Sequence, residues 1–213
     1  MEPDDVEIRA VACLVEKQRT TPDQYPLTLN SLRLACNQST NRDPVVDYDE
    51  STLRSALERL TRRKWVTLAS WSTARSVKYK HLFDRALALG DPELAVLTVL
   101  MLRGPQTSGE LRPRTERIHR FGSAEQLDAA IALLVERELC APMDRRPGER
   151  GRRFRHLLSS LDDDAAASAP GDDLAPAAAP PAADGLAARV ERLEAELGAL
   201  REEINGLRAE LGS

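Results

Sequence analysis

The stretch DESTLRSALERLTRRKWV, residues 49–66, decides the fold because the chain contains its pattern twice. Residues 123–140, SAEQLDAAIALLVERELC, repeat the order of apolar positions at an offset of 74 residues. Farther along, KYKHLF (78–83) aligns with RFRHLL (153–158) at an offset of 75 residues. Self-similarity at a fixed spacing indicates a duplicated structural unit, here of about 75 residues.

Each unit is predicted to contain three helices followed by two strands with a basic turn between them. Apolar residues recur at helical spacing over 6–18 and 29–36, and Asp49 is suited to cap a third helix. In the second unit, Ser123 and Gln126 are expected to form the equivalent capping box. The expected strands, which alternate in polarity, span 65–70, 76–83, 139–145 and 152–158.

Three helices followed by a hairpin are the winged-helix arrangement, a helix-turn-helix with a β wing. We therefore predict an α+β fold, mainly α with small β-hairpins, in which tandem winged-helix domains span 1–84 and 85–160. Residues 161–185 are mostly Ala, Pro and Asp with almost no large apolar side chain, which predicts a disordered linker. Residues 186–211 are rich in leucine and are expected to form a C-terminal coiled-coil helix.

The apolar residues of 186–211 follow one another in alternating steps of four and three. Leucine at every d position, with Val190 and Ile204 at two a positions, favours a parallel two-stranded coiled coil and hence a homodimer. In such a pair Glu196 faces Arg201 of the second copy, which is an attractive contact. The predicted dimerisation residues are Leu186, Val190, Leu193, Leu197, Leu200, Ile204, Leu207 and Leu211.

The net charge of −4 is unevenly distributed along the chain. Residues 1–160 hold 26 Lys and Arg and 22 Asp and Glu, a balance of +4, whereas residues 161–213 hold 4 and 12, a balance of −8. Within the first part, residues 54–85 carry nine basic and two acidic side chains. Because the positive charge is local, an acidic pI does not exclude a polyanionic partner such as DNA.

Several classes of protein are disfavoured. Three widely spaced cysteines argue against a disulfide framework, and the acidic N-terminus does not look like a signal segment. The longest apolar run, 94–102, is too short to cross a bilayer, so we expect a cytoplasmic protein without a membrane partner. The sequence has no phosphate-binding glycine loop, no HExxH and no CxxC, so no cofactor or metal is expected.

The segment LRLACNQSTNRDPVV, residues 32–46, combines a thiol with amide, hydroxyl and guanidinium groups. The segment is either a nucleophilic cysteine with the side chains that activate it, or the end of a helix followed by a turn. Cys36 shares a face with apolar residues, and Asn37 is suited to end the helix in the left-handed conformation. A nucleophile also requires a histidine, but His81 and His156 occupy equivalent positions of the repeat, which favours a packing role. We therefore predict a structural Cys36 and no enzymatic activity.

The third helix of each unit presents a different outward face. In the first unit this face carries Ser51, Ser55, Glu58 and Arg62, and Arg54 and Arg59 flank it. Ser and Arg suit phosphates and base edges, whereas Glu58 could accept a hydrogen bond only from cytosine. In the second unit this face carries Glu125, Ala129, Ala132 and Glu136. Phosphates would repel the two glutamates, so we expect a protein partner there. The basic hairpins are either phosphate contacts or solvated edges that resist aggregation. The predicted DNA-binding residues are Ser51, Arg54, Ser55, Arg59, Arg62, Arg63, Arg75, Lys78, Lys80, Arg150, Arg152 and Arg153.

Two early motifs, TTPDQYPLTLNSL (20–32) and ACNQSTNRDPV (35–45), together with LRGPQTSGELR (102–112) and the ending RRFRHL, resemble the YceH-like family. The resemblance covers about 1–158. It implies a bacterial protein of two winged-helix domains, and it implies no activity or site residues. Pro113 departs from the family pattern, so a kinked or short helix is expected there.

Two functions follow from these expectations. The first is a dimeric winged-helix DNA-binding protein with a regulatory role, with the third helix of the first domain in the groove and basic wings on phosphates. The second is a tandem winged-helix scaffold for protein–protein interaction that does not bind DNA, because a fold does not fix a function.

Overall fold

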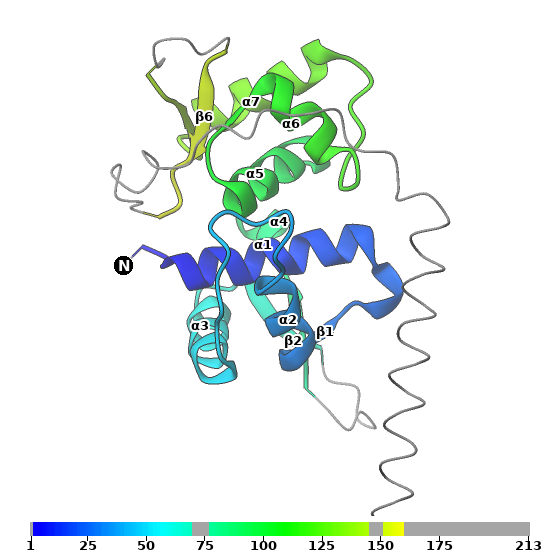
Figure 1. Ribbon diagram of the computed structural model, residues 1–213, viewed down its shortest axis with the longest axis vertical. Helices are drawn as coiled ribbons and strands as arrows, with labels where there is room; N and C mark the ends of the chain where they lie inside the picture. The colour runs from blue at the N-terminus through cyan, green and yellow to red at the C-terminus, as the bar shows by residue number, and fades with distance from the viewer. Residues whose placement is uncertain (1, 70–76, 145–150, 160–213) are drawn as a thin grey trace, which may run out of the picture. The chain divides into compact units, whose positions relative to one another are not determined.

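The computed structural model describes residues 2–69, 77–144 and 151–159, shown as ribbons in Figure 1. These residues belong to one compact unit. The predicted linker and the predicted coiled-coil helix lie outside the described residues, as do Arg75 and Arg150.

The first half of the described chain contains four helices and three short strands, and the strands form an antiparallel sheet in the order β1-β3-β2. In chain order the elements are α1 (Asp5–Thr20), the 3₁₀ helix η1 (Pro22–Gln24), β1 (Leu27–Thr28), α2 (Leu29–Cys36), α3 (Glu50–Arg62), β2 (Val66–Ala69) and β3 (Lys78–His81).

The second half repeats this order after one additional short helix, α4, except that its described residues contain no counterpart of η1. Its strands form a second antiparallel sheet in the order β4-β6-β5, which matches the first sheet strand for strand. The predicted α+β class is confirmed. The elements are α4 (Phe83–Ala86), α5 (Asp91–Arg103), β4 (Gln106–Thr107), α6 (Ser108–Thr115), α7 (Ala124–Glu136), β5 (Cys140–Pro142) and β6 (Arg153–His156).

The sheets differ from the prediction in two ways. Each has a third strand, β1 or β4, and the hairpin strands are shorter than expected. The additional strands are two residues long, too short to show an alternating pattern, and they exist because they pair with β3 and β6: Leu27 lies opposite Tyr79, and Gln106 opposite Phe154. The helix α4 was also missed, because four residues are too few for a helical period.

Side chains at the helix ends account for where the helices begin. Asp49 accepts a hydrogen bond from the Thr52 backbone N–H, which confirms the predicted cap of α3. Ser123 caps α7 in the same way, but the Gln126 side chain accepts from the Gly122 N–H and not from that of the cap residue, so the predicted capping box is only half formed.

The prediction for Asn37 was wrong in its backbone conformation. At φ −89° this residue is not left-handed. Its side-chain amide instead accepts from the Tyr48 N–H at 3.0 Å and donates to the Tyr48 carbonyl at 2.9 Å, which ties the end of α2 to the segment before α3. The helix α6 continues through Pro113 and has eight residues, the same length as α2.

One apolar core joins the two halves. In Figure 1, α1 lies between α2 and α3 on one side and α5 on the other, and it contacts all three. Every residue from Leu94 to Leu102 is buried, which explains the apolar run in the sequence as a helix surrounded by protein. Among the described residues no helix is both long and apolar enough to cross a membrane.

Candidate nucleic-acid interface

The helix α3 has one buried and one exposed face. Its apolar residues Leu53, Ala56, Leu57 and Leu60 are buried, because they recur at helical spacing toward α1 and α2. The residues predicted on the outward face are exposed: Ser51, Ser55, Glu58 and Arg62. Of the two flanking arginines, Arg54 is exposed and Arg59 is half-buried.

A shallow groove of about 450 Å³ runs between the C-terminal half of α3 and the hairpin of β2 and β3. On the hairpin side it is bordered by Leu68 and Tyr79, which lie opposite each other in the sheet. On the helix side, Arg54 and Arg62 flank the carboxylate of Glu58. Neither arginine has an ion-pair partner among the described residues, so both guanidinium groups are available to an external anion.

Two of the arginines predicted to bind DNA instead hold α3 against α1. Arg59 Nε and Arg63 Nε each lie 3.2 Å from a carboxylate oxygen of Glu7, whose side chain is only 2% exposed. Arg59 also pairs with Asp4, and the Arg63 guanidinium lies 5.9 Å from the centre of the Trp65 ring. Because a buried carboxylate needs its cations, these two arginines have a structural role.

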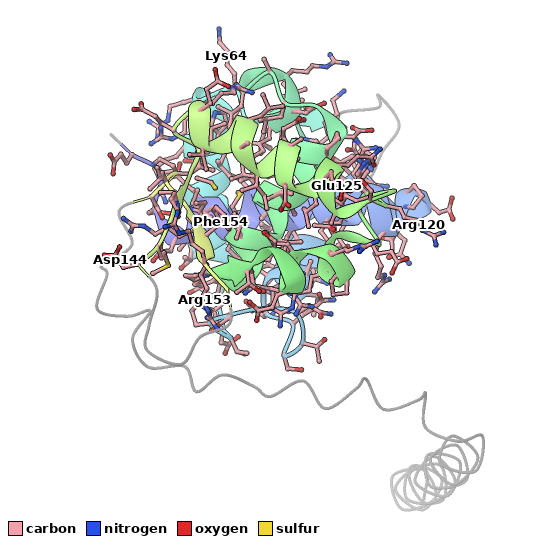
Figure 2. The ribbon with its side chains drawn as sticks, turned by 90° about the horizontal axis from the view of Figure 1, so that it is seen from above. Lys64, Arg120, Glu125, Asp144, Arg153 and Phe154 are labelled. Carbon is pink, nitrogen blue, oxygen red and sulfur yellow. The ribbon has the colours of Figure 1, made fainter. Side chains whose placement is uncertain are left out.

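The hairpin lysines are placed apart from the groove. Side chains alternate along β3, and Tyr79 borders the groove, so Lys78 and Lys80 project from the opposite face of the sheet. Lys64, which the sequence prediction left out, is exposed directly after α3 at φ 60°, and Figure 2 shows it projecting outward. Its position in the basic run Arg62-Arg63-Lys64, directly after two predicted DNA-binding residues, could have identified it from the sequence.

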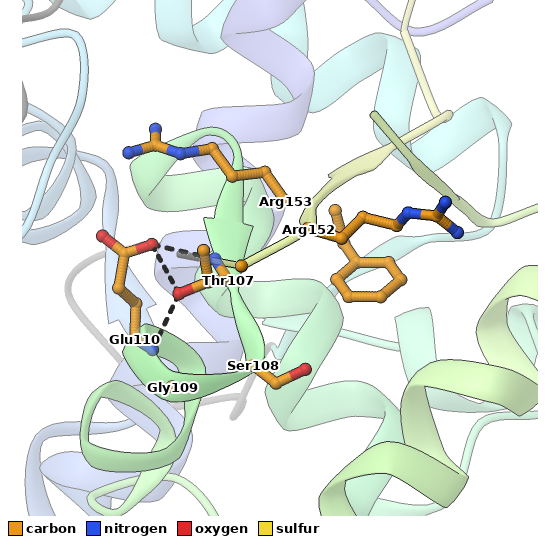
Figure 3. Close-up of a pocket in the computed structure, with 8 residues that line it drawn as sticks. Thr107, Ser108, Gly109, Glu110, Arg152 and Arg153 are labelled. Carbon is orange, nitrogen blue, oxygen red and sulfur yellow. Dashed lines mark hydrogen bonds between the residues drawn. The ribbon is translucent and has the colours of Figure 1, made fainter. Parts of the chain in front are cut away.

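The second half has its own pocket, of about 500 Å³, between the start of α6 and β6 (Figure 3). Arg152 is exposed at its rim and Arg153 is half-buried. The Glu110 carboxylate accepts hydrogen bonds from the Thr107 backbone N–H at 2.8 Å and from its hydroxyl at 3.0 Å. Burial opposes ionisation of Glu110, but these hydrogen bonds hold its pKa below the ordinary value. The carboxylate therefore lies at the N-terminus of α6, where its negative charge disfavours the binding of an anion.

The polar segment after α2 is bound to its own chain. Arg42 is buried, with Nη2 2.6 Å from Glu16 Oε2 and Nε donating to the Ala35 carbonyl at 3.1 Å. The Asp43 N–H donates to the Leu102 carbonyl, which joins the segment to the second half. These contacts fit a structural role, as predicted.

Cys36 is fully buried beside Cys13. The hydrogen bond between the two thiols, together with burial, raises the pKa of Cys36 well above its ordinary value, so the thiol stays protonated and is a poor nucleophile. The predicted packing role of the histidines is also supported. His81 and His156 are buried at equivalent positions of the two sheets, and burial lowers the pKa of each to about 4. In residues 2–69, 77–144 and 151–159, no group of acidic, Cys or His side chains is arranged to hold a metal ion.

Comparison with known proteins identifies the family. Residues 4–149, more than half of the chain, match the family described as a protein of unknown function, DUF480. The UPF0502 protein YceH of Escherichia fergusonii is 39% identical over 213 residues, and the alignment covers 97% of this chain and 96% of that protein. The UPF0502 protein of Shewanella halifaxensis is 41% identical, with 94% and 96% covered, and that of Opitutus terrae is 42% identical, with 92% and 82% covered. The chain belongs to this YceH-like bacterial family, as the sequence motifs predicted.

Proposed function

We propose that the protein is a homodimeric DNA-binding protein built from tandem winged-helix domains. In this proposal α1–α3 with β1–β3 form the first domain, and α5–α7 with β4–β6 form the second. The outward face of α3 enters the major groove of DNA. This assignment rests mainly on one observation: Arg54 and Arg62 line an open groove beside the hairpin and have no intramolecular counter-ion among the described residues.

The charges around α3 indicate which part of the helix meets the phosphates. Asp49 and Glu50 lie at its N-terminus, where they would repel a phosphate. Arg54, Arg62 and Lys64 lie farther along the helix or directly after it. We therefore expect Arg54, Arg62 and Lys64 to bind the backbone, while Ser51 and Ser55 face the base edges. Lys78 and Lys80, on the outer face of the hairpin, reach phosphates beyond the groove.

Dimerisation is assigned to residues 186–211. The support is the unbroken heptad pattern, which is the sequence signal of a parallel two-stranded coiled coil. The relatives from Escherichia fergusonii and Shewanella halifaxensis align over 97% and 94% of the chain, so each alignment extends into this C-terminal part. A dimer presents two copies of α3, which fits a DNA site with two halves.

A salt titration of the full-length protein with fluorescent genomic DNA fragments tests the proposal. Contacts with phosphates release counterions, so the logarithm of the affinity should fall linearly with the logarithm of salt concentration, with a slope of about −0.9 for each phosphate neutralised. Absence of binding at low salt, or affinity that does not change with salt, would exclude the DNA function.

The second candidate function is a protein-interaction scaffold. One observation favours it: the outward face of α7, at the position equivalent to that of α3, carries carboxylates and small apolar residues that phosphates would repel. In a protein that does not bind DNA, this face would be the main contact surface.

A further inference from the structure

The helix α7 has an outward face that the DNA-binding proposal leaves unused. Glu125, Ala129, Ala132 and Glu136 form a stripe along this face, because residues three and four apart lie one above another on a helix. All four are exposed, and Leu133 beside the stripe is 45% exposed. Figure 2 shows Glu125 at one end of this helix.

In the part of the chain that the structure describes, no ion pair involves Glu125, Asp128 or Glu136, which carry the charge of this face. A hydrogen bond from Ser123, together with the nearby charge of Arg112, holds the pKa of Glu125 below its ordinary value. The face therefore presents carboxylates at both ends of an uncharged centre.

Comparison with α3 shows that this chemistry is specific to the second half. Leu133 occupies the position of Arg59, which in the first half is bound to Asp4 and Glu7. Here the equivalent side chain is apolar and remains accessible, so it is available for an apolar contact with a partner. With Ala129 and Ala132 in the centre, a second helix can approach to an interaxial distance of about 8 Å, at the close end of helix packing.

The spacing of the two glutamates defines the kind of helix that can pack on this face. Glu125 and Glu136 are eleven residues apart, which is about 16 Å along the axis and places them on nearly the same side of the helix. A helix that packs here therefore needs two cations eleven residues apart, with small or apolar residues between them. The chain's own C-terminal part does not fit, because residues 161–213 hold 4 basic and 12 acidic side chains. DNA is excluded by repulsion from the carboxylates.

We propose that the outward face of α7 is a docking surface for a basic amphipathic helix of a partner protein. Complementary charge at both ends sets the register of the partner helix, and the alanine centre with Leu133 supplies the apolar contact. This surface is separate from the groove beside α3, so the protein can hold DNA and a partner at the same time.

The test uses a fluorescent helical peptide based on alanine and glutamine, with leucine in its centre and two lysines eleven residues apart. Its binding to the full-length protein is followed by anisotropy at physiological salt. The variant Glu125→Lys/Glu136→Lys should lose about tenfold in affinity, because both charge pairs become repulsive. Ala132→Gln, which adds bulk without charge, should also weaken binding.

Glu2→Lys/Asp23→Lys is the matched control, since it changes the net charge equally at exposed positions of the first half. It should bind the peptide like the wild type. A second peptide with lysines seven residues apart, two helical turns, should bind more weakly because it cannot reach both carboxylates. Equal loss in the control, equal affinity for both peptides, or unchanged affinity in the face variants would overturn the proposal. A change of self-association in Glu125→Lys/Glu136→Lys would overturn it in favour of a second copy of the chain.

Discussion

Replacing Glu7 with alanine removes the carboxylate that joins α1 to α3. Glu7 is 2% exposed, and its oxygens lie 3.2 Å from the Nε atoms of Arg59 and Arg63 and accept the Asp4 backbone N–H at 3.1 Å. Removing one partner of a buried ion pair costs about 3–5 kcal/mol. The cost should lie near or below the low end of that range, about 2–3 kcal/mol, because both arginine side chains keep some access to water and Arg59 retains Asp4.

This loss is large enough to measure by thermal unfolding. For a protein of this size, each 1 kcal/mol shifts Tm by about 2–4 °C, so Glu7→Ala should lower Tm by about 4–12 °C at a fixed protein concentration. Glu7→Gln, which keeps the volume and one acceptor oxygen, should have a smaller effect. Circular dichroism at a single helical wavelength is a sufficient assay.

Glu116→Ala is the control. Glu116 pairs with Arg120 at 3.6 Å, but the two side chains are 59% and 84% exposed, and such a surface pair contributes only a few tenths of a kcal/mol. If Glu7→Ala and Glu116→Ala lower Tm by the same small amount, then Arg59 and Arg63 are not structural, and their assignment to DNA becomes open again.

Three further predictions concern stability and assembly. The pKa values of His81 and His156 are about 4 in the folded protein, below the unfolded value of about 6.5. The free energy of unfolding, measured by urea titration, should therefore be highest above pH 6.5 and fall by up to about 3 kcal/mol per histidine as the pH drops toward 4. A free energy of unfolding that does not change over this pH range would contradict the burial of the two histidines. Cys36→Ala should cost about 1–2 kcal/mol, and rapid modification of the native thiol by a thiol reagent would show that it is not buried. Glu196→Arg should weaken the dimer and added Arg201→Glu should restore it, whereas a monomeric wild-type mass at tens of micromolar rules out the coiled coil.

The sequence was sufficient to predict the elements whose residue pattern is long and local. The helices α1, α3 and α7 extend over three turns or more, so their apolar stripes could be identified from the sequence, as could the cap residues of α3 and α7. The duplication showed the equivalence of His81 and His156. The two-residue strands β1 and β4 carry no period of their own, and only pairing with β3 and β6 defines them.

The candidate site was harder to predict because its residues depend on contacts between distant segments. A helical wheel places Arg59 and Arg63 beside the outward face of α3, but the carboxylate that binds them, Glu7, lies more than 50 residues earlier in the chain. In the same way, strand alternation separates Lys78 and Lys80 from Tyr79 without indicating which set faces the groove.

The charge reversal Arg54→Glu/Arg62→Glu, followed by a DNA salt titration, tests the central claim most directly. Both side chains are exposed, so the fold should be retained, and Arg85→Glu/Arg117→Glu makes the same change of charge at exposed positions elsewhere. If α3 binds DNA, the first variant should lose binding at physiological salt, and any binding left at low salt should have a slope shallower by about 0.9 for each lost phosphate contact. The control should bind like the wild type. Equal affinity and equal slope in both variants would contradict the placement of DNA on α3.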